Sequence, residues 1–309
     1  MKQFGTTAIA TAAPEENATA LLLEDRLGRF RDIPIYERAR EDGTWEPVQV
    51  EDFIADVRRL AKGLIGAGVR PGDVVAIMSR TRYEWALVDW AIWFAGGVSV
   101  PVYETSSPSQ IQWITGNSGA RFAIVETVRH AEDVASVRDQ LPALERILTI
   151  DKPEDLDSLR EAGASVTDEQ LEEARTSRGK DDVATIIYTS GTTGRPKGAE
   201  LTHANFIETA RNALDLLGTD VVPPGSRMLM FLPLAHVFAR LLTVLTATWG
   251  VTTAFTPDTK NLVADLQSFK PTFLLAVPRV FEKVYNSAEQ KAAADGKEKI
   301  FGLAARTAI

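Results

Sequence analysis

Residues 188–203 read YTSGTTGRPKGAELTH, and this stretch decides the fold prediction. The apolar run 183–187 before it is typical of a buried strand. A loop that leaves the carboxyl end of a parallel strand lies where open α/β sheets bind ligands. Three glycines let backbone N–H groups approach an anion closely, and hydroxyls and a lysine add donors. The glycines are Gly191, Gly194 and Gly198, and the donors are Thr189, Ser190, Thr192, Thr193 and Lys197. We therefore predict that residues 189–197, the phosphate loop, bind a phosphate chain.

The pattern differs from other phosphate-binding loops. A Walker A sequence needs Gly, four residues and then Gly-Lys-Ser/Thr, whereas Lys197 follows Pro196 and precedes Gly198. The Gly-x-Gly-x-x-Gly loop of kinases is absent from this segment. A polar turn without a ligand is the alternative, because Gly, Ser and Thr dominate turns. Lys197 follows Gly191 and Gly194 at a fixed spacing, and the loop lies between a buried strand and a second strand-then-helix unit. This arrangement favours an anion-binding site over a turn without a ligand.

Outward from this loop, apolar strand patterns alternate with amphipathic helical patterns in both directions. This alternation predicts an α/β fold with parallel-rich sheets flanked by helices. Strands are predicted at 74–78, 98–103, 122–126, 147–150, 183–189, 228–232, 251–255 and 273–277. Helices are predicted at 51–68, 83–95, 109–118, 131–141, 203–217, 237–249 and 262–269, with another beginning near Val280.

The same patterns suggest a division of the chain. We expect a flexible N-terminus at 1–15, one subdomain at about 16–150 and a phosphate-loop subdomain at 183–309. The charged connector 151–182 is interpreted as a solvated link with one short helix around 169–174. No Gly, Asn or Pro stop signal follows the last helical pattern, which favours a fold that is still incomplete at Ile309.

Composition excludes several classes of function. The chain has 309 residues, of which 45% are hydrophobic and 25% charged, as in average globular proteins. A net charge of −8 argues against nucleic acid as a partner. The absence of cysteine excludes disulfides, thiolate metal sites and an enzyme-bound thioester, and it fits a reducing cytoplasm. The N-terminus is poor material for a signal peptide, and no apolar window reaches the roughly 18 residues of a membrane span.

Four blocks of this sequence resemble one family. YTSGTTGRPKGAELTH resembles the phosphate-binding signature of the adenylate-forming, or AMP-binding, enzyme superfamily. FLPLAHVFAR at 231–240 is similar to that family's substrate-side segment. AVPRVFEK at 276–283 and PVYETSSPSQIQWI at 101–114 resemble its long-chain fatty-acid–CoA ligase branch. The likeness extends over almost the whole chain after about residue 15.

The resemblance implies a fold, a reaction and site residues. The fold would be part of the large N-terminal domain of an acyl-adenylate synthetase, built of layered α/β/α subdomains. A fatty acid would react with ATP to acyl-AMP, and CoA would then take the acyl group. The loop would hold the ATP phosphates, Lys197 and His236 would serve catalysis, and Thr192 would contact Mg²⁺. The expected phosphate-binding residues are Thr189, Ser190, Gly191, Thr192, Thr193, Gly194 and Lys197.

Other family motifs do not occur in this chain. The block that holds adenine, the ribose-binding segment, the hinge and the C-terminal lid domain are missing, so we expect the chain alone to be inactive. The alternatives are an enzyme that adenylates an aryl or amino acid, and a truncated, non-catalytic protein that binds nucleotide or acyl groups. We expect a cytoplasmic location and leave peripheral contact with the inner face of the membrane open, because long-chain substrates partition into bilayers.

Histidines and one apolar stripe complete the candidate residues. His236 follows a predicted strand and Pro233, which places it at a carboxyl end, whereas His130 and His203 gain no support from the family pattern. His203 is expected to open a helix capped by Thr202. Apolar residues at helical spacing after His236 either face the core or line an acyl pocket. These residues are Val237, Phe238, Leu241, Leu242 and Leu245.

Overall fold

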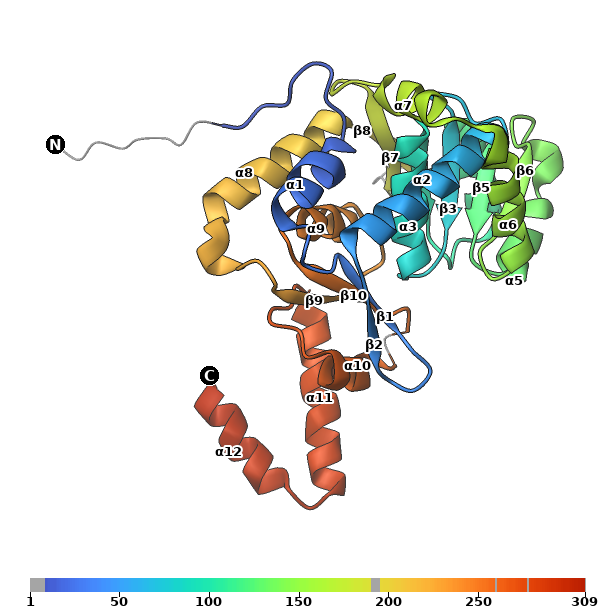
Figure 1. Cartoon of the computed structure of the whole chain (residues 1–309). Helices are drawn as coiled ribbons and strands as arrows, with labels where there is room; N and C mark the ends of the chain where they lie inside the picture. The colour runs from blue at the N-terminus through green and yellow to red at the C-terminus, as the bar shows by residue number, and fades with distance from the viewer. Residues whose placement is uncertain (1–8, 190–194, 259, 277, 309) are drawn as a thin grey trace.

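Strands and helices alternate along the chain in the computed structural model, which describes residues 9–189, 195–258, 260–276 and 278–308 (Figure 1). The strands are β1 Tyr36–Ala39, β2 Trp45–Val48, β3 Val74–Met78, β4 Val98–Val102, β5 Phe122–Val125, β6 Arg146–Thr149, β7 Val183–Thr189, β8 Lys197–Thr202, β9 Arg227–Met230 and β10 Thr252–Phe255. The helices are α1 Leu27–Phe30, α2 Val50–Gly66, α3 Tyr83–Phe94, α4 Pro108–Ser118, α5 Val128–Ala135, α6 Pro153–Ala162, α7 Asp168–Thr176, α8 His203–Val221, α9 Val237–Thr248, α10 Leu262–Phe269, α11 Pro278–Ala294 and α12 Glu298–Ala308. Short helical turns occur at Leu21–Arg26, Arg138–Gln140 and Gly163–Ser165.

The strands form two sheets. The six-stranded sheet has the order β6-β5-β3-β4-β7-β8, and its neighbours are parallel except for β7 and β8. The four-stranded sheet has the order β2-β1-β10-β9, with β1 and β2 antiparallel. The predicted α/β class with parallel-rich sheets is confirmed. The predicted division at 16–150 and 183–309 does not coincide with the sheets, because β7 and β8 join the first sheet and β1 and β2 the second.

Helices fill the space between the two sheets and form the main core. Helices α2, α3 and α9 contribute to one continuous apolar cluster with both sheets. Tyr36 of β1 illustrates the contact, with ring centroids 4.8 Å from Phe53 of α2 and 5.9 Å from Tyr83 of α3. Nearly every residue of α3 is buried, and apart from Glu84 and Asp89 the helix carries apolar or aromatic side chains around its whole circumference.

Further helices cover the outer faces of the sheets. In β3, Val75 and Ile77 belong to the central cluster, whereas Ala76 and Met78 pack with residues of α4 and α5. This alternation follows from the two-residue period of a strand. Helix α10 packs against the outer face of the four-stranded sheet. Helices α11 and α12 extend away from the body (Figure 1). None of the helices in the described part is long and apolar enough to cross a membrane.

Two predicted features are wrong. The connector 151–182 holds two helices, α6 and α7, instead of one short helix in a solvated link. Helix α6 packs against α2 so closely that a Cβ on Gly163 would lie 2.6 Å from the backbone nitrogen of Gly63. The expected strand at 273–277 is reduced to one isolated parallel bridge between Met228 and Phe273. The successive amides of Thr272 and Phe273 donate to the same Arg227 carbonyl, at 2.9 Å and 3.4 Å, so the segment does not continue into the alternating ladder of a strand.

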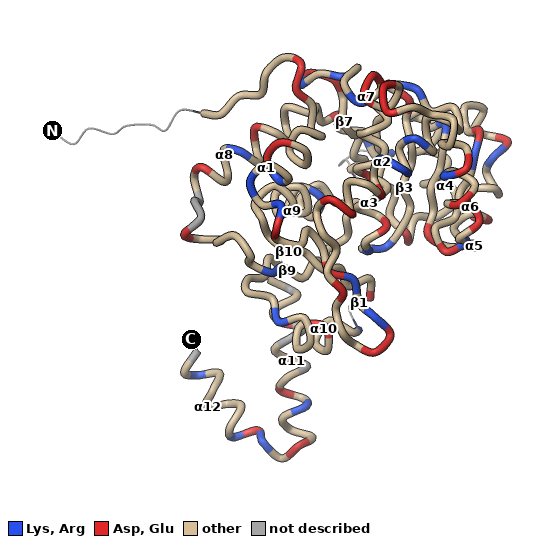
Figure 2. Tube along the Cα trace, viewed as in Figure 1, with Lys and Arg blue, Asp and Glu red and all other residues tan. Residues whose placement is uncertain are grey.

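Polar contacts anchor elements at the surface. Arg58 of α2 contacts Glu172 of α7 at 2.7 Å. Figure 2 shows acidic and basic residues interspersed along the described elements.

The N-terminal segment also makes contacts. The Ala10 amide donates to the Asn212 side chain at 2.9 Å, and the Ala12 amide donates to Glu208 at 3.2 Å. Both partners lie on α8, so part of the expected flexible N-terminus, residues 10–12, is attached to this helix.

Candidate functional site

The phosphate loop connects two antiparallel strands. Strand β7 ends at Thr189 and β8 begins at Lys197, and these two residues are paired across the hairpin. Both are exposed. Ser190, Gly191, Thr192, Thr193 and Gly194 lie outside the described residues. The structure therefore places the first and last residues of the predicted set opposite each other at the base of the loop.

Close packing in the hairpin explains one glycine. A Cβ on Gly198 would lie 2.7 Å from Cγ2 of Ile186 and 3.1 Å from the ring of Tyr188. Burial, followed by the charge of Glu200, raises the pKa of Tyr188. Its hydroxyl remains protonated and donates to Asn117 Oδ1 at 2.6 Å. Asn117 lies on α4, so this bond ties β7 to the helix that follows β4.

Helix α4 also holds the base of the phosphate loop. The indole N–H of Trp113 donates to the carbonyl oxygen of Pro196 at 2.8 Å. The guanidinium of Arg195 lies 4.7 Å from the centroid of the same ring, in cation–π range. At the start of α4, Ser107 and Gln110 form a capping box. We did not predict these roles, although Trp113 lies in the block 101–114 whose resemblance to the ligase branch was noted.

His236 lies between β9 and α9. It is the N-cap residue of α9, and its Nδ1 accepts a hydrogen bond from the Phe238 amide at 3.2 Å. The side chain is exposed, as a residue that contacts a substrate needs to be. The hydroxyl of Thr81, after β3, donates to the carbonyl of Leu232, after β9, at 2.8 Å. This bond joins the carboxyl ends of the two sheets, so His236 follows a strand at the predicted edge.

The other two histidines have structural positions. His203 begins α8 directly after its N-cap Thr202, as predicted, and it is 2% exposed. Its Nδ1 accepts a hydrogen bond from the Ala18 amide at 3.2 Å. Burial, followed by the charge of Arg178, lowers the pKa of His203 to about 4, so the ring is neutral at pH 7. His130 lies on α5, and its amide donates to the N-cap hydroxyl of Thr127.

The apolar stripe of α9 divides between two environments. Leu242 and Leu245 are buried in the central core. Val237 and Leu241 instead line a hollow of about 260 Å³ between α8 and α9, together with Leu201, Asn205, Phe206 and Thr209. Phe238 is 43% exposed. The core interpretation therefore holds for Leu242 and Leu245, whereas Val237 and Leu241 line a hollow.

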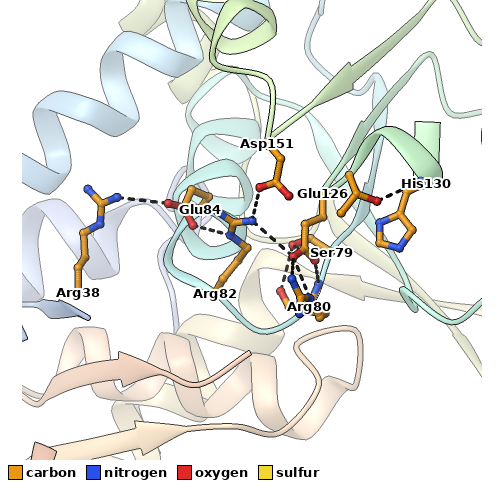
Figure 3. Close-up of polar contacts among 9 residues, drawn as sticks. Arg38, Ser79, Arg80, Arg82, Glu84, Glu126, His130 and Asp151 are labelled. Carbon is orange, nitrogen blue, oxygen red and sulfur yellow. Dashed lines mark hydrogen bonds and ion pairs between the residues drawn. The ribbon is translucent and has the colours of Figure 1, made fainter. Parts of the chain in front are cut away.

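A second polar cluster lies at the carboxyl ends of β3 and β5 (Figure 3). The buried carboxylate of Glu126 accepts hydrogen bonds from the Arg80 amide and from its Nε, each at 2.8 Å. Burial would raise the pKa of Glu126, but the hydrogen bonds and charge of Arg80 lower it. Arg82 contacts Asp151 at 2.7 Å. The adjoining hollow of about 370 Å³ is lined by arginines and carboxylates that neutralise one another, so we interpret the cluster as a structural ion-pair network.

Comparisons with known proteins agree with this arrangement. The sequence matches the AMP-binding enzyme family over residues 23–306. The long-chain-fatty-acid–CoA ligase FadD15 of Mycobacterium tuberculosis is 45% identical, over 100% of this chain and 51% of the relative. The human long-chain-fatty-acid–CoA ligase ACSBG1 is 30% identical, over 88% of this chain and 39% of that protein. The crystal structure of a long-chain-fatty-acid-CoA ligase, FadD1 of Archaeoglobus fulgidus, superposes with a TM-score of 0.75 at 20% identity, covering 93% of this chain and 56% of that one.

These matches define the class of protein. The chain belongs to the AMP-binding enzyme family, because the match covers most of its length. The structural likeness, at 20% identity, supports the fold alone. The chain spans about half the length of the ligase that is 45% identical to it.

Proposed function

We propose that this chain is the phosphate- and acyl-binding part of a long-chain fatty-acid–CoA ligase. The observation that carries the proposal is the apolar hollow beside α9. It begins at Val237, directly after His236, and it includes Leu201 of β8, four residues after Lys197. An apolar pocket thus starts one residue after His236 and shares strand β8 with Lys197, and a site that activates fatty acids needs such a pocket. Identity of 45% to a ligase of this name, over the whole of this chain and 51% of that protein, supports the same substrate class.

The proposed reaction has two steps. A carboxylate oxygen of the fatty acid attacks the α-phosphorus of ATP, and the bond to pyrophosphate breaks. The sulfur of CoA then attacks the carbonyl carbon of acyl-AMP, and AMP leaves. Because the first step brings an anion to a polyanion, neutralisation of charge and positioning supply much of its rate. Lys197 and the loop hydroxyls would neutralise the phosphates, and His236 would lie near the carboxylate.

We propose that Mg²⁺ enters with ATP, bound mainly to phosphate oxygens and water, as is usual for this ion. The Thr192 hydroxyl would be one protein contact. CoA would be the second substrate. We further propose that the protein acts in the cytoplasm, with peripheral membrane contact while it takes up long-chain acids.

The hollow matches part of an acyl chain. Its volume of about 260 Å³ is near the lower end of the roughly 300–1,000 Å³ of small-molecule pockets. Each methylene buried there stabilises the complex by about 0.8 kcal/mol. A long acyl chain would therefore gain more binding free energy in the hollow than acetate or an amino acid. This difference distinguishes a fatty-acid substrate from the alternative carboxylates.

The test is a substrate profile of the longer protein that contains this chain. ATP–pyrophosphate exchange is measured with palmitate, octanoate, benzoate and a set of amino acids, and we expect palmitate to be preferred. Preference for benzoate or an amino acid would refute the long-chain assignment. ATP binding without exchange for any acid would instead support the non-catalytic alternative.

A variant then tests the pocket itself. Leu241→Trp fills part of the hollow, and excluding about two methylenes should lower kcat/KM for palmitate about 15-fold. Exchange with shorter acids should change little. Leu303→Trp, at an exposed position of α12, is the matched control. Equal effects of Leu241→Trp on all acids would place the acyl chain elsewhere.

A further inference from the structure

A buried ion pair joins α9 to α3. Arg240 of α9 and Asp89 of α3 have side chains that are only 1% and 5% exposed. Arg240 donates from Nε to Asp89 Oδ2 at 2.9 Å and from Nη2 to Asp89 Oδ1 at 2.7 Å. The contact is bidentate, which fixes the orientation of both side chains.

The same guanidinium also contacts two strands. Its Nη2 donates to Ser99 Oγ of β4 at 2.7 Å, and its Nη1 donates to Thr185 Oγ1 of β7. The Thr185 hydroxyl in turn donates to the Ser99 carbonyl at 2.6 Å. The rings of Trp93 and Phe206 lie 5.0 Å and 5.3 Å from the guanidinium carbon. One side chain therefore joins α9, α3, β4 and β7.

Stability alone is a weak reason for this arrangement. Removing two charges from water is costly, and well-packed apolar residues often replace a buried pair at no net loss. The contacts instead fix the position of α9, because the four hydrogen bonds of the Arg240 guanidinium have fixed directions and allow little sliding of α9 along β7. Breaking the pair on one side would leave an uncompensated buried charge.

We propose that Arg240 is a positioning residue that holds His236 at a set distance from Thr189 and Lys197, the described base of the phosphate loop. Arg240 lies four residues, about one helical turn, after His236. Its partner Thr185 lies four residues before Thr189, where the phosphate loop begins. The two parts of the site are thus fixed to one buried junction. Only the expected effect of Arg240 on catalysis rests on the proposed function, whereas its effect on the position of His236 does not.

The test replaces both charges together. Arg240→Met with Asp89→Leu keeps the interior filled and leaves no unpaired charge, so the melting temperature should stay within a few degrees of wild type. Spin labels on Glu200→Cys and Phe238→Cys report the distance between β8 and α9, and residues 1–309 contain no other cysteine that would take up the label. We expect a shifted or broader distance distribution. Because misplacement by about 1 Å can cost 100-fold, kcat for adenylation should fall by about that factor.

A matched control uses another partly buried pair. Arg227 contacts Glu37 at 2.6 Å, at the start of β9 and away from His236. Arg227→Met with Glu37→Leu should leave both the distances and kcat unchanged. If the double variant does not fold, Arg240→Lys replaces it in the test. Lysine keeps the positive charge but lacks the planar guanidinium, so the kcat of this variant should fall about 10-fold.

The outcomes separate the two proposals. A folded Arg240 variant with the wild-type distance distribution, or with altered distances and full kcat, overturns the positioning role. Absence of adenylation by the wild-type longer protein refutes the proposed function, and the label distances then still decide whether Arg240 sets the separation between β8 and α9.

Discussion

Protonation of His203 should destabilise the fold as the pH falls. The imidazole is buried beside Trp93, with ring centroids 5.9 Å apart, and its Nδ1 already accepts a hydrogen bond from the Ala18 amide. A proton on Nδ1 would break this bond and place a charge near Arg178 and Arg240, which only Asp182 offsets. The folded chain therefore disfavours the imidazolium.

The magnitude follows from the pKa values of the two states. The pKa is about 4 in the folded chain and 6.5 for an ordinary histidine. Because the folded pKa is the lower one, the unfolded chain takes up the proton first. Stability is fully present above about pH 6.5 and is lost as the pH falls toward 4. The whole loss is about 3 kcal/mol, of which about 2 kcal/mol has occurred at pH 5.

The assay compares urea unfolding of wild type and His203→Gln at pH 7, 6 and 5. Tryptophan fluorescence and circular dichroism must coincide before free energies are calculated. Wild type should lose about 2 kcal/mol more than the variant between pH 7 and pH 5. His236→Gln removes an exposed imidazole and should retain the wild-type loss. Equal pH dependence of His203→Gln and wild type would refute the assignment of His203 as a buried neutral group.

The remaining predictions concern the phosphate loop and the helix packing. Lys197→Ala in the longer protein should strongly reduce ATP–pyrophosphate exchange, and an unchanged rate would remove Lys197 from its proposed role. Trp113→Ala removes the hydrogen bond to Pro196 and the stacking on Arg195, so calorimetry should show ATP binding weakened about 5- to 50-fold, whereas Trp113→Phe should retain part of the affinity. A methyl at Gly66 would lie 2.5 Å from the carbonyl carbon of Ala162, and Gly66→Ala should cost about 1–3 kcal/mol in denaturant unfolding. Gly28→Ala, which meets open space, is its control, and equal stabilities of the two variants would contradict the close packing.

Elements with strong local patterns could be predicted from the sequence. Strand β3 and helix α10 match their predicted ranges, because an apolar run bounded by turn residues and a 3.6-residue period are local signals. Strands β1 and β2 were not predicted. Each has four residues, and β1 is stabilised by pairing with β10, more than 200 residues away in the chain. Such pairing depends on tertiary contacts that a local window does not contain.

The candidate site divides in the same way. The sequence predicted Thr189, Lys197 and His236 as site residues. Glycine, hydroxyl, lysine and histidine residues follow apolar strands there, and this local pattern already indicates an anion-binding site. Trp113 and Arg195 were not, because their contact joins α4 to the loop across more than 80 residues.

The sequence by itself determined the α/β class, the phosphate loop and the family resemblance. These depend on residue types at short spacing, and short spacing is set by the covalent chain. Only the tertiary structure decided which residues of α9 face the core and which line the hollow, and that Arg240 joins α9 to β7. The physical reason is that burial and hydrogen-bond partners are properties of packed elements, so they exist only once distant segments of the chain have come together.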